Sequence, residues 1–206
     1  MCVLIIKQQG VKTPTKEILT ACAKANPHGF GFVTPTKFFK STDLGDFLNE
    51  AAKIDTNEPA LIHCRYATHG SVKPSNCHPF MIGDWAFAHN GILYDIKPEN
   101  DKTDSETAFK QLFYPLIKGK NEMPVNVSNF INSYVGSSKF AFLNVKSQKI
   151  YKFGNFTNKD RLLFSNTRWE SYLPQKTPKF KIFAEYRNAD FYNKVFADLD
   201  DEQLPF

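Results

Sequence analysis

Cysteine is scarce in this chain of 206 residues, which contains four. Their spacing is irregular and includes no Cys-x-x-Cys pair, so the pattern does not indicate a disulfide-rich secreted scaffold. Thiols stay reduced in the cytoplasm, and we therefore expect a cytoplasmic protein.

Long apolar runs are also missing. No stretch reaches the roughly 20 apolar residues that a membrane helix needs. The first residues lack the basic and then apolar pattern of a secretion signal. The sequence therefore predicts no association with a membrane.

Arginine is rare as well, and the formal net charge of +5 comes mainly from lysine. The four arginines are Arg65, Arg161, Arg168 and Arg187. Grooves that bind nucleic acid usually combine arginine with aromatic residues or carry a dense basic stripe. Here the lysines are dispersed, which indicates a solvated surface, and we expect no direct binding of nucleic acid.

The composition that remains is that of a globular protein. Hydrophobic residues make up 42% of the chain, and 20 phenylalanines supply an aromatic-rich core. A chain of this length fits one domain that buries about 70% of the surface of its unfolded form. We expect a single domain over residues 2–197, followed by an acidic tail over residues 198–206.

Strand-like and helix-like segments follow one another in blocks along this domain. The expected strands cover residues 2–8, 29–33, 37–40, 60–66, 79–82, 85–88, 139–145, 149–153, 161–165 and 180–184. The expected helices cover residues 15–25, 43–51, 104–116 and 127–135. Hairpin-rich strands with helices in blocks predict an α+β sandwich, in which helices cover two antiparallel sheets.

Cys2 directly follows the initiator methionine. Methionine is normally removed before a residue as small as cysteine, and the mature chain would then carry a thiol and a free α-amine on its first residue. The two groups titrate near ~8.5 and ~8. The amine can therefore activate its own thiol as a nucleophile, on the condition that Met1 is removed.

Four of the five histidines gather between His63 and His89. Chance clustering on neighbouring strands is one explanation, and a metal site is another. The candidate ligands would be Cys64, His69, Cys77 and His78. Their spacing matches no structural-zinc pattern, so we expect neither a metal nor an organic cofactor.

Four short blocks follow Cys2 in order: HCRYATHG at 63–70, NCHPF at 76–80, WAFAHNG at 85–91 and TDSE at 103–106. With Cys2, this set closely resembles the class II glutamine amidotransferases, which are N-terminal-nucleophile hydrolases. The residues of these motifs are most similar to the stand-alone branch linked to hydrolysis of γ-glutamyl compounds. The resemblance implies a four-layer αββα sandwich of the N-terminal-nucleophile hydrolase type.

Four side chains are candidates for binding the amino-acid end of glutamine. Arg65 is a planar bidentate donor suited to the α-carboxylate, with a structural ion pair as its alternative. Thr68 and His69 could contact the same end, or they could only form a turn before Gly70. Asp104 could hold the α-ammonium, and it could also cap the helix that follows.

Asn90 and Gly91 are candidates for the oxyanion site. Attack on an amide creates an oxyanion, and the side-chain NH₂ of Asn90 with the backbone N–H of Gly91 would stabilise it. The alternative is a hairpin turn, because Asn-Gly is a common two-residue turn.

The leading hypothesis is an enzyme that cleaves the γ-amide of glutamine or of a γ-glutamyl compound through a γ-glutamyl thioester on Cys2. The ammonia or amine released would pass to water or to a separate synthase or hydrolase partner. A second hypothesis keeps the N-terminal nucleophile and assigns it another amide.

The third hypothesis is a catalytically degenerate binding protein. Residues 198–206 combine acidic residues with a final Pro-Phe, and they look like the acidic tip of bacterial single-stranded-DNA-binding proteins. Such a tail would dock on a protein of a DNA-processing complex. Its simpler alternative is a frayed acidic end.

Overall fold

The computed structural model describes residues 2–174, and those up to Leu173 belong to one compact unit. The strand predicted at residues 180–184 and the acidic tail at 198–206 lie outside the described residues. Two antiparallel sheets form the centre of the unit.

The first sheet has six strands in the order β3-β2-β4-β1-β10-β9. Their bounds are β1 Val3–Lys7, β2 Phe30–Val33, β3 Phe38–Ser41, β4 Ala60–Cys64, β9 Thr157–Lys159 and β10 Leu162–Phe164. Strand β1 pairs with β4 over its whole length, from Val3 opposite Cys64 to Lys7 opposite Ala60. On its other side, Ile5 lies opposite Phe164 of β10. The first strand of the chain is therefore an interior strand.

The second sheet has four strands in the order β5-β6-β7-β8. Their bounds are β5 Phe80–Ile82, β6 Trp85–Asn90, β7 Lys139–Asn144 and β8 Lys149–Phe153. Strand β6 runs beside β7, so that Trp85 lies opposite Asn144 and Asn90 opposite Lys139.

The two sheets pack face to face. The first sheet contributes larger side chains such as Leu4 and Ile6, whereas the second contributes Ala86, Ala88 and Ala141 beside Leu143. Small residues opposite large ones let the two layers interdigitate. Because β1 is buried on both faces, its sequence is a continuous apolar run rather than an alternating one.

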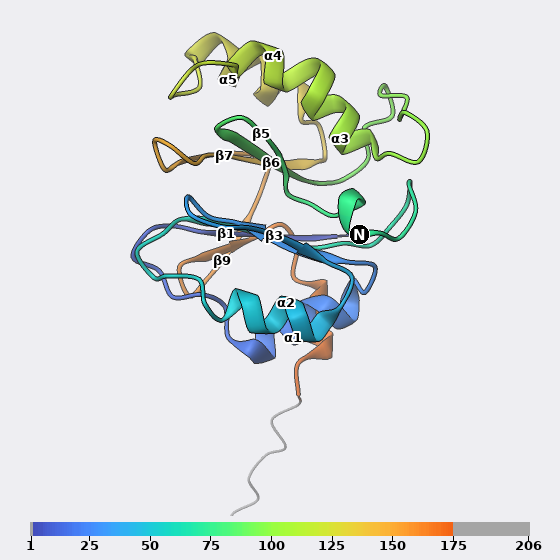
Figure 1. Ribbon diagram of the computed structural model, residues 1–206, viewed down its shortest axis with the longest axis vertical. Coiled ribbons are helices and arrows are strands. Elements are labelled where there is room, and N and C mark those ends of the chain that lie inside the picture. Colours follow the sequence, from blue (N-terminus) through green and yellow to red (C-terminus); the bar gives the residue numbers. More distant parts are fainter. Residues whose placement is uncertain (1, 175–206) are drawn as a thin grey trace, which may run out of the picture. The chain divides into compact units, whose positions relative to one another are not determined.

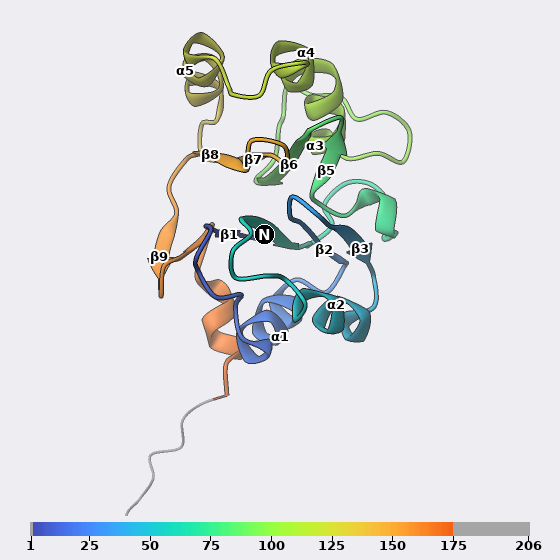
Figure 2. The same cartoon turned by 60° about the vertical axis from the view of Figure 1, so that its left-hand side comes forward.

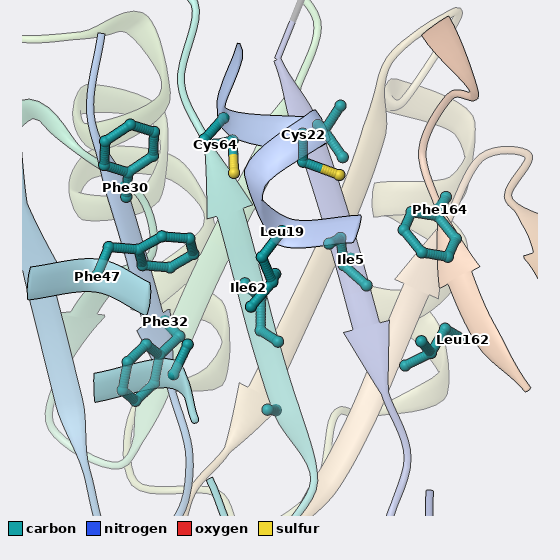
Figure 3. Packing of buried hydrophobic residues seen from close by; sticks show 14 of the residues in the cluster. Ile5, Leu19, Cys22, Phe30, Phe32, Phe47, Ile62, Cys64, Leu162 and Phe164 are labelled. Carbon is teal, nitrogen blue, oxygen red and sulfur yellow. The ribbon is translucent and has the colours of Figure 1, made fainter. Parts of the chain in front are cut away.

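Helices cover the outer face of each sheet, which gives four layers (Figure 1). Helices α1 (Lys16–Ala25) and α2 (Leu44–Ala51) lie on the first sheet. Figure 3 shows Leu19 and Cys22 of α1 beside Ile5 and Ile62 of the sheet. The second sheet carries the helical segments α3 (Asp104–Ala108), η2 (Phe109–Phe113), α4 (Tyr114–Ile117) and α5 (Val125–Tyr134) (Figure 2). The predicted α+β fold with two antiparallel sheets covered by helices is confirmed.

The ends of the elements differ in places from the predictions. The helix predicted at 104–116 is continuous, but its middle part, Phe109–Phe113, is a π-helical turn. Thr103, and not Asp104, caps this helix, because its hydroxyl accepts a hydrogen bond from the Glu106 N–H. The short strand β9 and the 3₁₀ turns at Pro74–Asn76 and Arg168–Tyr172 were not predicted. Among residues 2–174, no helix has the length and apolar character needed to cross a membrane.

Candidate functional site

Cys2 lies at the start of β1, where backbone groups of two other segments hold it. The Tyr66 N–H, just beyond β4, donates to the Cys2 sulfur at 3.2 Å. The Cys2 carbonyl accepts a hydrogen bond of 2.7 Å from the side-chain amide of Asn166. The β-type run of residues 3–7 and its pairing with β4 thus fix the thiol at the beginning of an interior strand.

The surroundings of Cys2 shift the pKa of its thiol in opposite directions. Burial raises the pKa of its thiol, while the hydrogen bond from the Tyr66 backbone and the charge of Arg65 lower it. Burial is the largest of these effects, so the thiol stays protonated at neutral pH. A nucleophile at this position therefore needs a base beside it.

A cavity of about 240 Å³ opens in front of the thiol. It brings together four predicted site residues from distant parts of the chain, namely Cys2, Thr68, Asn90 and Gly91. The rest of its wall is formed by Tyr66, Ile92, Tyr94, Ser137 and Lys139.

Asn90 ends β6, and Gly91 follows it. The Asn90 side-chain NH₂ donates one hydrogen bond of 2.8 Å to the Ser165 hydroxyl, which leaves its second hydrogen for a ligand. The Ser165 oxygen also accepts from the Leu4 N–H at 2.9 Å, so it connects the Asn90 amide to β1. The hairpin alternative is wrong, because β6 pairs with β5 and β7 and not with the segment after Gly91.

Gly91 has a conformation and surroundings that exclude a side chain. Its φ is +153°, a region that residues with a Cβ rarely adopt. A Cβ would overlap the Ser138 hydroxyl and come within 2.7 Å of the His89 Nε2. Glycine is therefore required where the backbone passes the cavity.

Arg65 lies behind the cavity wall rather than on it. It is 2% exposed. Its Nη1 donates to the Ser71 carbonyl at 3.0 Å, and its Nη2 donates to the carbonyls of His69 and Gly70 at 2.6 and 3.1 Å. The guanidinium thus shapes the loop after β4, and its contact with an α-carboxylate stays a prediction.

His69 and Asp104 line a neighbouring cavity of about 420 Å³. This cavity shares Ile92 and Tyr94 with the cavity at Cys2. Asp104 is buried, and its carboxylate accepts hydrogen bonds of 2.8 Å from the N–H groups of Leu93 and Ser105. These donors stabilise a negative charge at the place where an α-ammonium is expected.

A buried chain of hydrogen bonds links Asp104 to the Gly91 segment. The Ser105 hydroxyl lies 3.2 Å from Asp104 Oδ1 and 2.8 Å from His89 Nδ1. The opposite ring nitrogen, Nε2, is 3.1 Å from the Ser138 hydroxyl. Burial lowers the pKa of His89 to about 4, so its ring is neutral at pH 7. His89 therefore acts as a neutral spacer between the two ends of the site.

Two further histidines support this strand from the inner side. His63 Nε2 lies 3.1 Å from the His89 carbonyl, which can only accept, so the neutral His63 carries its proton on Nε2. Burial lowers the pKa of His63 to about 3 and that of His78 well below its ordinary value. The rings of His63 and His78 lie 4.3 Å apart. They fit a structural role better than one as acid or base.

The described part of the chain contains no set of ligands that would support the metal alternative. Between residues 2 and 174, no three or more His, Cys, Asp or Glu side chains are placed to hold an ion together. Cys64 instead packs in the apolar core between the first sheet and α1, as Figure 3 shows.

Three supporting residues were not predicted from the sequence: Ser138, Ser165 and Asn166. Ser165 and Asn166 directly follow β10, a strand whose pairing with β1 is not visible in the sequence. The polar pair at the end of the strand predicted at 161–165 is a signal that could have found Ser165 and Asn166, whereas Ser138 precedes β7 without such a signal.

The chain was compared with known proteins. A family model described as "Glutamine amidotransferases class-II" matches residues 34–159. The chain is also similar to a glutamine–fructose-6-phosphate aminotransferase (isomerizing) from Zymomonas mobilis, with 35% identity over 60 residues, 27% of this chain and 10% of that protein. The protein of the same name from Vibrio parahaemolyticus is 39% identical over 54 residues, 26% of this chain and 8% of that protein. The matches thus span a tenth or less of these relatives' length.

Proposed function

Because this chain belongs to the class II glutamine amidotransferases, we propose that it cleaves the γ-amide of glutamine or of a γ-glutamyl compound. One observation carries the proposal. Cys2, Thr68, Asn90 and Gly91 line a single cavity, although they come from three separate segments of the chain. The cavity offers a nucleophile together with donors for the charge that forms on the substrate.

The reaction begins with attack of the Cys2 sulfur on the amide carbonyl carbon. The α-amine of Cys2, freed by removal of Met1, takes the thiol proton. The tetrahedral oxyanion accepts hydrogen bonds from the free N–H of the Asn90 side chain and from the Gly91 N–H. Transfer of the proton to the leaving nitrogen breaks the C–N bond, which releases ammonia or an amine and leaves a γ-glutamyl thioester.

Water then hydrolyses the thioester. The α-amine removes a proton from the attacking water, the same donors stabilise the second oxyanion, and the Cys2 sulfur leaves as glutamate forms. Each step needs only the groups at the cavity, so the mechanism requires neither a metal nor an organic cofactor.

The amino-acid end of the substrate is assigned to the loop after β4 and to the start of α3. Asp104 binds the α-ammonium, and Thr68 and His69 contact the same end. Arg65 binds the α-carboxylate through the N–H groups that the carbonyls of its loop do not use. The shared wall of the two cavities supports this direction of binding.

Water or a separate synthase or hydrolase in the cytoplasm receives the released ammonia. The relatives' printed name describes an aminotransfer to fructose 6-phosphate. Their match to this chain covers too little of their length to assign that acceptor here. Hydrolysis is the activity that the residues at the cavity support by themselves.

The test uses protein whose intact mass shows that Met1 has been removed. We expect release of glutamate and ammonia from glutamine, and covalent labelling by the glutamine analogue 6-diazo-5-oxo-norleucine. The Cys2→Ala variant should lose both. Cys22→Ala is the matched control, because this thiol is buried between α1 and the first sheet and its loss should leave turnover unchanged.

Two results would contradict the proposal. Processed protein that neither hydrolyses glutamine or γ-glutamyl peptides nor reacts with the analogue would favour a binding protein. Turnover that persists in Cys2→Ala would show that another residue is the nucleophile.

A further inference from the structure

A third cavity of about 570 Å³ lies beside the site, between the end of α5 and strands β7 and β8. It shares Ser137 and Lys139 with the cavity at Cys2. The cavity of His69 and Asp104 adjoins the Cys2 cavity through other residues, Ile92 and Tyr94. The site therefore continues past the thiol toward β7 and β8 as well as toward Asp104.

The charge of this third cavity has one sign. Its ten lining residues include Lys139 and Lys152 and no aspartate or glutamate. The Lys139 ammonium donates to the Ser137 carbonyl at 2.9 Å. Among residues 2–174, neither lysine has a carboxylate partner, although seven other lysines do. Two cations without anions at the end of a substrate groove favour an anionic ligand.

The remaining wall is polar and shaped by the backbone. Neutral side chains such as Asn132, Ser137 and Asn155 line it, and Gly154 has a φ of +85°. A Cβ on Gly154 would overlap the Ser138 carbonyl, so glycine lets the β8 end lie close to the segment before β7. The cavity is thus a defined feature of the β7–β8 edge.

We propose that this lysine cavity binds the leaving amine of a γ-glutamyl substrate and selects amines that carry a carboxylate. The inference rests on the proposed function and names its substrate class. With the α-ammonium at Asp104 and the amide carbonyl between Cys2 and Asn90, the substituent on the amide nitrogen points away from the Asp104 cavity. Lys139, which lines both cavities, then meets this substituent first, and the exposed Lys152, which lines the third cavity and not the Cys2 cavity, lies beyond it.

The experiment compares γ-glutamylglycine with γ-glutamylglycinamide, which differ only in the charge of the leaving part. Processed protein should have a higher kcat/KM for the carboxylate. In Lys152→Gln this preference should fall about two- to fivefold at low ionic strength, the size expected for a partly exposed ion pair. Glutamine turnover should stay unchanged, because glutamine does not reach the lysine cavity.

Lys146→Gln is the matched control, since it removes the same charge from an exposed position in the turn after β7. It should keep the full preference. Calorimetric binding of the two substrates to Cys2→Ala gives the same comparison without turnover, and the carboxylate should bind more tightly.

Equal kcat/KM values for the two substrates, or an unaltered preference in Lys152→Gln, would show that the lysine cavity is not a subsite for the leaving amine. If the same protein still hydrolyses glutamine, the proposed function stands. Equal binding to Cys2→Ala would overturn the subsite too. Loss of glutamine hydrolysis in processed wild-type protein would instead contradict the proposed function itself.

Discussion

At the scale of single residues, Ser165 holds Asn90, the proposed oxyanion donor, in place. Its oxygen accepts from the Leu4 N–H and from the Asn90 side chain, so it ties the donor to the strand of the nucleophile. When one hydrogen of the side-chain amide is held by Ser165, the other stays directed at the cavity and needs no reorganisation during the reaction. Ser165 is therefore a positioning residue.

Replacing Ser165 by alanine should lower kcat by about tenfold or more while KM for glutamine changes little, because Asn90 loses its anchor but not its place in the chain. The buried Leu4 N–H would lose its partner, so the free energy of unfolding should fall by about 1–3 kcal/mol. Steady-state kinetics and urea unfolding measure the two effects. Ser171→Ala on the exposed 3₁₀ turn is the control, and an unchanged kcat in Ser165→Ala would refute the positioning role.

Gly91→Ala should lower kcat by about 10²–10³, the usual effect of losing one oxyanion donor. The added methyl overlaps the Ser138 hydroxyl, so the Gly91 N–H must shift. Gly119→Ala separates this effect from backbone strain, because Gly119 also has a positive φ, +73°, but no atom within 4 Å of an added Cβ. Equal activity of the two variants would argue against the Gly91 N–H as a donor.

At the scale of elements, β1 ends at a buried lysine that closes a loop. The Lys7 ammonium donates to the carbonyls of Asp55, Thr56 and Glu58, between α2 and β4. It is fully buried, and burial lowers its pKa. The ammonium thus ties the end of β1 to the backbone of this loop.

Lys7→Met keeps most of the apolar stem and removes the three donors. We expect a loss of about 1–3 kcal/mol in the free energy of unfolding, because the three hydrogen bonds from the Lys7 ammonium to the loop would be lost. Lys12→Met, at an exposed position after the strand, should change stability by less than about 0.5 kcal/mol. Equal denaturation midpoints for both variants would show that the carbonyls find other donors.

Most elements could be predicted from the sequence, because their local signals agree with their environment. Strand β1 begins with a run of apolar residues, and Asp43 caps α2, because its carboxylate accepts a hydrogen bond from the Asp46 N–H. Strand β9 could not be predicted, since Thr157–Lys159 is short and polar and becomes a strand only through pairing with β10. The capping role of Thr103 was equally hidden, because threonine and aspartate both cap helices well.

The candidate site was predictable in its residues and less so in its contacts. The sequence motifs indicated Cys2, Asn90 and Gly91 as site residues, and all three line one cavity. The hydrogen bonds of Arg65 to the carbonyls of its own loop and the support of Asn90 by Ser165 depend on long-range packing. No local pattern encodes such contacts.

At the scale of the whole molecule, three buried neutral histidines make stability depend on pH. Burial lowers the folded-state pKa of His63, His78 and His89 below the unfolded value of about 6.5. Below that pH the unfolded state binds more protons than the folded state. Stability should therefore fall as the pH drops from about 6.5 toward 4, by up to about 1.4 kcal/mol per pH unit for each histidine.

Urea unfolding at several pH values between 7.5 and 5 measures this slope. His78→Phe should flatten it, because neither ring nitrogen of His78 has a hydrogen-bond partner in the described structure and phenylalanine fills a similar space. A slope identical to that of the wild type would show that the pKa of His78 does not differ between the folded and unfolded states.

The interior position of β1 sets the conditions under which the site can come apart. A strand paired on both sides and buried on both faces exchanges its amide hydrogens only when the whole fold opens. The nucleophile is the residue directly before this strand, so local fluctuations of outer elements leave its position unchanged. Loss of activity in denaturant should consequently follow the global unfolding curve rather than precede it.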